Sequence, residues 1–95
     1  MEIPKSVKIG NSTFAVTPLH EDSTDDYYGR SNTTRDEIKL NFNVGSDHLA
    51  ETFLHEIIHV ICQQHKWSEI DKDEKIVHPL ACALYQVLKD NGFLK

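Results

Sequence analysis

The stretch at positions 53–61, FLHEIIHVI, constrains the fold of this chain more than any other. Its His55 and His59 are four residues apart, so on an α-helix both imidazoles lie on one face, about 5–6 Å apart. That separation lets both rings bind one Zn²⁺ at about 2.0–2.1 Å per Zn–N bond. Glu56 follows the first His and projects beside such a metal, where a general base for its water is needed. The stretch therefore predicts a helix that carries a metal site.

The residues around the two His help to decide between a metal site and an ordinary core helix. The positions that flank and separate them are bulky and apolar: Phe53, Leu54, Ile57, Ile58, Val60 and Ile61. A helix that is apolar on nearly all sides is a buried helix. Burying two His and a Glu without partners is costly, and a bound metal offsets that cost. The alternative is a core helix whose imidazoles make neutral hydrogen bonds.

Length, charge and cysteine content limit the class of protein. The chain has 95 residues, enough for one domain (1–95) with a small core that a bound metal would help to hold. A net charge of −5 argues against a nucleic-acid partner. The sequence has neither an apolar run of membrane-spanning length nor a signal-peptide core at its start. Cys62 and Cys82 lie in apolar helical stretches and fit reduced thiols, so we expect a cytoplasmic protein.

Apolar and polar residues alternate in the first part of the chain, which predicts strands. Segments 6–9 and 13–17 form a predicted β-hairpin around Gly10, which supplies the positive φ of a tight turn. Segment 21–26 is acidic and turn-rich and lacks the spacing of a calcium loop, so we expect a solvated loop. Segment 26–31 is expected to be a short strand or a bend.

The clearest strand is 37–44, in which alternate residues are apolar. Gly45 and Ser46 end it, and Ser46 is a candidate N-cap for the motif helix, expected from Asp47 to Gln64 or His65. These elements predict an α+β fold, with a mostly antiparallel sheet of three or four strands packed on the motif helix.

A second helix is expected from Asp71 to Asp90. Asp71 and Glu74 have the spacing of a capping box at its start, and Asn91-Gly92 is a stop signal at its end. Pro79 inside this helix removes a backbone hydrogen bond and predicts a kink beside His78.

A catalytic zinc needs a third protein ligand and an open position for water. We favour His78, because a second helix antiparallel to the first brings that region across from His55 and His59. Glu74, one turn earlier on the same face, is the second choice. His65 has the spacing of the third ligand in the metzincin pattern, but Cys62 stands where that pattern has Gly. On a continuing helix His65 also faces away from His59.

Cys62 allows a different arrangement. It lies three residues after His59 on the same helical face. His55, His59, Cys62 and one residue of the last helix could therefore complete a closed structural site. Small buried cysteines on facing helices are nevertheless the commoner arrangement.

With these residues the chain resembles the zincin superfamily, specifically the minimal gluzincin-like metallopeptidases often encoded by phages and prophages. The resemblance covers roughly residues 27–93 and is carried by ETFLHEIIH at 51–59, the strand before it and the helical tail LACALYQVLKDN at 80–91. It implies that His55 and His59 are metal ligands and that Glu56 is the general base. Such families usually present a Glu as third ligand, whereas the best-placed residue here is His78.

The activity implied is hydrolysis of a peptide or protein substrate by a zinc-activated water, with Zn²⁺ on His55, His59 and His78. In zincins the strand before the motif helix lies along the cleft. We therefore expect segment 37–43 to be a sheet edge that pairs with substrate. Candidate oxyanion donors, for which packing roles are commoner, are Tyr27, Tyr28, Arg30 and Tyr85.

Two other functions are compatible with the same residues. One is a non-catalytic interaction module in which zinc only joins the helices to the sheet, favoured by the small size and by Cys62. The other is a metal-dependent ribonuclease, because His55, His59 and His65 have the spacing of the three-His site of small rRNA-maturation hydrolases. The acidic net charge and Glu56 argue against the ribonuclease.

Overall fold

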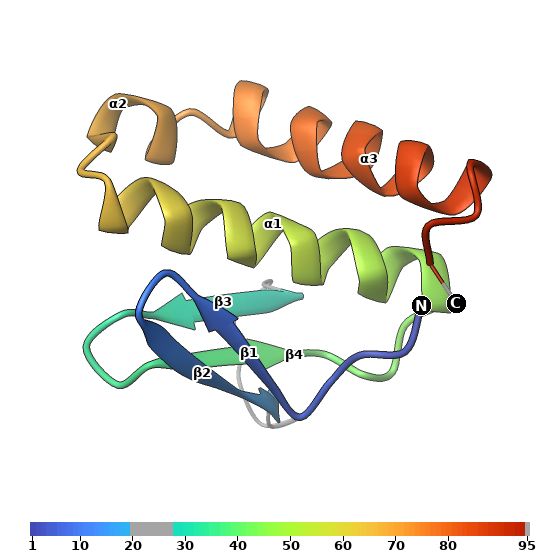
Figure 1. Cartoon of the computed structure of the whole chain (residues 1–95), viewed down its shortest axis with the longest axis horizontal. Coiled ribbons are helices and arrows are strands. Elements are labelled where there is room, and N and C mark those ends of the chain that lie inside the picture. The colour runs from blue at the N-terminus through green and yellow to red at the C-terminus, as the bar shows by residue number, and fades with distance from the viewer. Residues whose placement is uncertain (20–27, 95) are drawn as a thin grey trace.

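The computed structural model describes residues 1–19 and 28–94, and segment 21–26 and Tyr27 lie outside them. The elements are, in order, β1 (Ser6–Ile9), β2 (Ser12–Pro18), β3 (Gly29–Asn32), β4 (Glu37–Leu40), α1 (Ser46–Gln64), α2 (Ser68–Asp71) and α3 (Glu74–Asp90). The sheet packs on one side of α1, and α2 and α3 pack on the other (Figure 1). The α+β class predicted from the sequence is confirmed.

Helix α1 is the middle layer because its sequence is apolar on opposite faces. Phe53 and Val60 belong to a buried cluster with strand residues such as Ile38. Ile58 and Cys62 belong to a second cluster with Val77 and Ala81 of α3. Each large aliphatic or aromatic side chain buried in this way contributes about 1.5–3 kcal/mol. The prediction of a buried motif helix is confirmed.

The sheet has the strand order β1-β2-β4-β3. β1 and β3 pair antiparallel with β2 and β4 respectively, while β2 and β4 pair parallel. The sheet is therefore mixed, although two of its three described ladders are antiparallel. The hairpin of β1 and β2 turns at Gly10, whose φ of +61° confirms the predicted turn.

The prediction that segment 37–43 is a sheet edge is wrong, because β4 has a neighbour on each side. The alternation of Ile38 and Leu40 with polar residues reports which face is buried, but not which strands lie to either side. The chain leaves β2, forms β3 and returns to pair β4 with β2, so β3 becomes the outer strand. This edge strand also contacts α1.

Strand β4 ends at Leu40 rather than at the predicted Val44. The side-chain oxygen of Asn41 accepts a hydrogen bond from the backbone N–H of Asn43 at 2.9 Å, which forms a local turn. Phe42 consequently leaves the sheet and is 43% exposed. The alternation of apolar and polar residues continues to Val44, but the turn at Asn41 ends the strand at Leu40.

The N-terminus of α1 differs slightly from the prediction. Its N-cap is Gly45, and Ser46 is the first helical residue rather than the cap. The helix ends at Gln64, as expected.

The predicted second helix is divided in two, because α2 ends at Asp71 and α3 begins at Glu74. The cap of α3 is Asp73, whose side chain accepts from the backbone N–H of Lys75 at 3.0 Å. The predicted capping box of Asp71 with Glu74 is therefore wrong. Both carboxylates point instead toward the motif histidines, as described below. Helix α3 continues through Pro79.

Both cysteines of the sequence, Cys62 and Cys82, are free thiols. None of the helices formed by residues 1–19 and 28–94 combines the length and the apolar character needed to cross a membrane.

Candidate metal centre

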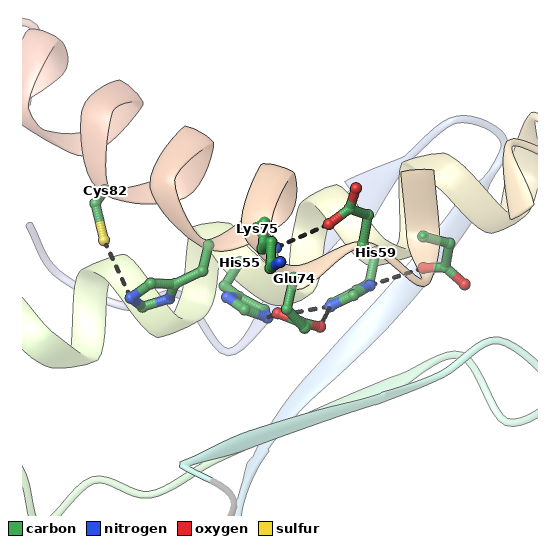
Figure 2. A network of polar contacts seen from close by, with 8 residues as sticks. His55, His59, Glu74, Lys75 and Cys82 are labelled. Atoms are coloured by element: carbon green, nitrogen blue, oxygen red, sulfur yellow. Dashed lines mark hydrogen bonds and ion pairs between the residues drawn. The ribbon is translucent and has the colours of Figure 1, made fainter. Parts of the chain in front are cut away.

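Three side chains from two helices converge where the start of α3 meets α1. The Nε2 atoms of His55 and His59 on α1 are 3.1 Å apart. Glu74, the first residue of α3, places Oε2 at 3.1 Å from Nε2 of His55 and Oε1 at 2.9 Å from Nε2 of His59. Figure 2 shows the Glu74 carboxylate reaching between the two rings. Within the described residues, these three side chains form a group that could hold a metal ion.

The chemistry of the three donors fits a cation. Two neutral imidazole lone pairs and a carboxylate repel one another at 2.9–3.1 Å unless a proton or a metal lies among them. Tetrahedral zinc with bonds of 2.0–2.1 Å would space its ligand atoms roughly 3.3 Å apart, close to the separations in this group. Imidazole nitrogen and carboxylate oxygen also suit other first-row metals, so this donor set does not identify the metal.

Asp71 fixes the orientation of His59. Its Oδ1 lies 2.7 Å from Nδ1 of His59, and the carboxylate stands at the end of α2. When Nδ1–H donates to Asp71, the neutral ring carries its lone pair on Nε2, the atom that faces Glu74. Metal-binding histidines are commonly held by a carboxylate in this way.

The two rings differ in their affinity for protons. Burial and the neighbouring His59 and His78 lower the pKa of His55, and the opposing attraction of Glu74 is too weak to restore it. Burial also acts to lower the pKa of His59, but the hydrogen bond to Asp71 and the nearby carboxylates outweigh it and raise the pKa. His55 therefore offers a lone pair readily, whereas at His59 a proton competes with a metal.

Glu56 lies beside this group but is not part of it. It is 7% exposed and is the buried charged residue of the described core. Burial raises the pKa of Glu56, against the lowering effects of His59 and of a hydrogen bond from Ser31 on β3. A carboxyl group with a raised pKa is a better proton acceptor at neutral pH than an ordinary glutamate.

Gly29 allows β3 to lie close to α1 at this point. A Cβ atom at Gly29 would be 2.7 Å from Cγ2 of Thr52 and 3.2 Å from Cγ of Glu56. A larger residue would push β3 away from the helix. The glycine thus places the edge strand, with Ser31 on it, directly beside Glu56.

Two neighbouring clefts open on the candidate metal centre. The first, which we call the hairpin cleft, has a volume of about 530 Å³ and is lined by the β3–β4 hairpin together with His55, Glu56, His59 and Glu74. The second, which we call the helix cleft, has a volume of about 580 Å³. It is lined mainly by Tyr28 and by residues of α1 and α3, including His48, Glu51, His78 and Cys82, and it also reaches Glu56. Glu74 is 59% exposed, so the centre is open to solvent.

His78, the third ligand favoured from the sequence, lies near the centre but outside the group of three. Its ring centroid is 5.6 Å from that of His55, and its Nε2 is 3.7 Å from Sγ of Cys82. A dashed line from the labelled Cys82 thiol marks this contact in Figure 2. A hydrogen bond to Glu51, together with burial, raises the pKa of Cys82 to about 11, so the thiol stays protonated at neutral pH. The structure thus brings Glu74, the second choice, to the two motif histidines.

The other candidate residues lie elsewhere. His65 follows the end of α1 and stacks on Trp67 at 4.9 Å between ring centroids. Cys62 is buried in the apolar cluster between α1 and α3. Tyr85 donates a hydrogen bond to Asp47 at 2.6 Å, near the other end of the helix pair. Among the suggested oxyanion donors, Tyr28 lines the helix cleft and Arg30 the hairpin cleft.

Two residues of the site were not foreseen as such. Asp71 was interpreted as a helix cap, and its partner His59 is twelve residues earlier, across the turn between helices. Ser31 lay in a segment with only a weak strand signal. Both act through contacts between elements, so local spacing carried no signal for them.

The likeness to the gluzincin-like peptidases is carried by the motif around His55 and His59. It stays a prediction, since the chain matches no protein-family model, no curated protein and no solved structure.

Proposed function

We propose that this protein is a zinc-dependent peptidase. The observation that carries the proposal is the convergence of His55, His59 and Glu74 next to the buried carboxylate of Glu56, at the junction of two open clefts. A purely structural metal site made of these three side chains would not need a further buried residue, Glu56, whose carboxyl group has a raised pKa.

His55, His59 and Glu74 would hold the metal, and Asp71 would orient His59. A zinc ion in such a site would polarise the carbonyl of the peptide bond and would lower the pKa of a water toward neutrality. A carboxylate oxygen of Glu56 accepts the proton of the attacking water and later delivers it to the leaving amine nitrogen. The raised pKa of Glu56 suits both transfers, because a group that titrates nearer neutrality accepts and releases a proton more readily.

Strand β3 is the proposed docking edge for the peptide. It is the outer strand on the side of the sheet where Ser31 contacts Glu56. A substrate paired with β3 as an added strand would have its backbone held by sheet hydrogen bonds. The role expected of segment 37–43 thus moves to β3, the outer strand of the described sheet that lies beside Glu56.

The closed structural site and the ribonuclease are less well supported. Cys62 packs among apolar side chains rather than at the centre, so it does not add a fourth ligand to His55 and His59. His65 stacks on Trp67.

Glu56→Gln tests the proposed base. The substitution keeps size and shape, so we expect full zinc binding but peptide cleavage reduced by at least about a hundredfold. Zinc content and the hydrolysis of a quenched-fluorescent peptide mixture are measured together. Glu69→Gln, on an exposed residue of α2, is the matched control and should retain both properties.

Two outcomes would contradict the proposal. Undiminished cleavage by the zinc-loaded Glu56→Gln protein would remove Glu56 from the mechanism. A wild-type protein that binds zinc stoichiometrically and cleaves no member of the mixture would favour the structural site instead.

A further inference from the structure

Positive charge is concentrated at one of the two clefts. The sequence has two arginines, Arg30 and Arg35, in a chain with a net charge of −5. Both line the hairpin cleft, together with Lys39. They come from β3, from the turn after it and from β4, so a single hairpin carries all three cations.

The geometry of the hairpin keeps these cations together. Arg30 is directly opposite Lys39 in the antiparallel ladder of β3 and β4. Residues opposite each other project from the same face, which here is the face away from the buried Ile38 and Leu40, at the outer edge of the sheet. Arg35 lies in the connecting turn, where the side-chain oxygen of Asn32 accepts from the backbone N–H groups of Thr34 and Arg35 at 2.9 and 3.1 Å. The turn is therefore held by its own sequence.

The described lining of the hairpin cleft also includes three carboxylates, Glu37, Glu56 and Glu74. Glu56 and Glu74 belong to the candidate metal centre, where a divalent cation would balance them. The remaining carboxylate, Glu37, lies 3.6 Å from Nζ of Lys39. The wall of the cleft built by the hairpin thus carries three cations and one anion among its described residues.

The helix cleft shows the opposite character. Its described lining has no Lys or Arg and includes Glu51, His48 and the aromatic ring of Tyr28. Both clefts share His55, Glu56 and Glu74. A peptide bound across the candidate metal centre would therefore meet a cationic wall in the hairpin cleft and a neutral to acidic wall in the helix cleft.

We infer that the hairpin cleft selects peptides that present a carboxylate next to the reacting bond. The inference rests on the proposed peptidase function and names its substrate class. The guanidinium groups of Arg30 and Arg35 match a carboxylate in shape and in charge. That carboxylate comes from an acidic side chain or from the end of a peptide chain. At physiological salt, charges beyond about 8 Å are screened, so the local cations outweigh the net negative charge of the protein.

The test uses two fluorescein-labelled short peptides of identical sequence except that one has glutamates where its twin has glutamines. Each is made with a free and with an amidated C-terminus, which separates side-chain from chain-end carboxylates. Binding to the Glu56→Gln protein is followed by anisotropy, with and without zinc. We expect the glutamate peptide, or the free-end peptide, to bind about tenfold more tightly than its neutral twin.

Arg35→Gln should reduce this preference to about threefold or less, and Arg35→Glu should shift it toward a lysine-containing peptide. Lys8→Gln, on β1 at the other edge of the sheet, removes the same charge far from the cleft and should keep the preference. Equal binding of acidic and neutral peptides, or an undiminished preference in Arg35→Gln, overturns the inference.

The results also separate this inference from the proposed function. Cleavage of acidic and neutral peptides with the same kcat/KM leaves the peptidase intact and removes the selective cleft. Preferential binding of acidic peptides without cleavage by the wild-type protein keeps the cleft and removes the peptidase.

Discussion

Among the polar contacts that connect α1 with α3 in the described part of the chain, two clusters are built differently. Near the start of α1, Asp47 accepts hydrogen bonds from the Tyr85 hydroxyl at 2.6 Å and from the Lys89 ammonium at 3.0 Å. Farther along α1, the Nε2 atoms of His55 and His59 face the carboxylate of Glu74. The Asp47 cluster joins one acceptor to two donors, whereas in the second cluster a carboxylate meets two ring nitrogens that are acceptors themselves when they carry no proton.

The difference separates a contact that stabilises the fold from a group of side chains that could bind a metal ion. Matched donors and acceptors satisfy each other and need no further partner. Converging acceptors lower their energy only when a proton or a metal joins them. The same pair of helices therefore holds a structural contact at one end and a candidate site at the other. The predictions below test this contrast.

The largest effect is expected from Glu74→Ala. Removing one of the three donors should weaken zinc binding by more than about a hundredfold, beyond the 10–100-fold typical of residues that only support a ligand. His78→Ala is the matched control on the same helix and should keep the affinity within a few-fold. Competition with a chelating dye measures both. Loss of zinc from His78→Ala but not from Glu74→Ala would restore His78 as the third ligand.

Zinc should stabilise the fold through the centre alone. At a free concentration one hundred times Kd, the free energy of unfolding should rise by about 2.7 kcal/mol. Asp47→Asn should show the same increase, because the two clusters act independently. A protein with both His55 and His59 changed to Ala should show none. Denaturant unfolding with zinc or with a chelator measures the difference, and an increase that survives in the double variant would place the metal elsewhere.

Asp71→Asn should weaken zinc binding by about 10–100-fold, because the amide no longer holds His59 as the carboxylate does. Asp73→Asn is the matched control, since asparagine also caps helices and the cap of α3 is kept. Calorimetric titration measures the affinity of both. Equal affinities of Asp71→Asn and wild type would mean that the 2.7 Å contact does not orient the ring.

The smallest effect concerns the pH dependence of the Asp47 cluster. Hydrogen bonds from Tyr85 and then from Lys89 hold the pKa of Asp47 below its ordinary value of 3.8. Its contribution to stability is therefore complete above about pH 3.8 and is lost as the pH falls through the lower pKa of the folded state.

We accordingly expect Asp47→Asn to be less stable than wild type at neutral pH, with a difference that shrinks in acid and in high salt. Urea unfolding at a series of pH values measures it. Tyr85→Phe, which keeps the ring, should lose part of the same dependence. A difference that stays constant into strong acid would mean that ionisation of Asp47 does not stabilise the fold.

Neighbouring residues of one helix could be predicted from the sequence. The facing pair of His55 and His59 follows from the helical period, and the apolar residues around them required α1 to be buried. Glu56 could be foreseen beside the pair for the same reason. Each of these inferences depends on spacing within one element.

Residues that meet across elements could be predicted only in part. Glu74 and His78 lie one turn apart on the same helix, and both were candidates for the third ligand. Which one reaches the histidines depends on how far α3 slides along α1, and that is set by the cap at Asp73 and by the packing of Val77 and Ala81.

The sequence by itself determined the class of fold, the buried motif helix and the pair of facing imidazoles, because these follow from hydrophobic periodicity and helix geometry. The tertiary structure alone decided that β3 rather than segment 37–43 is the sheet edge, that Glu74 completes the group of donors and that Asp71 orients His59. Side-chain spacing is fixed within an element, whereas the order of strands and the offset of helices arise from packing between elements.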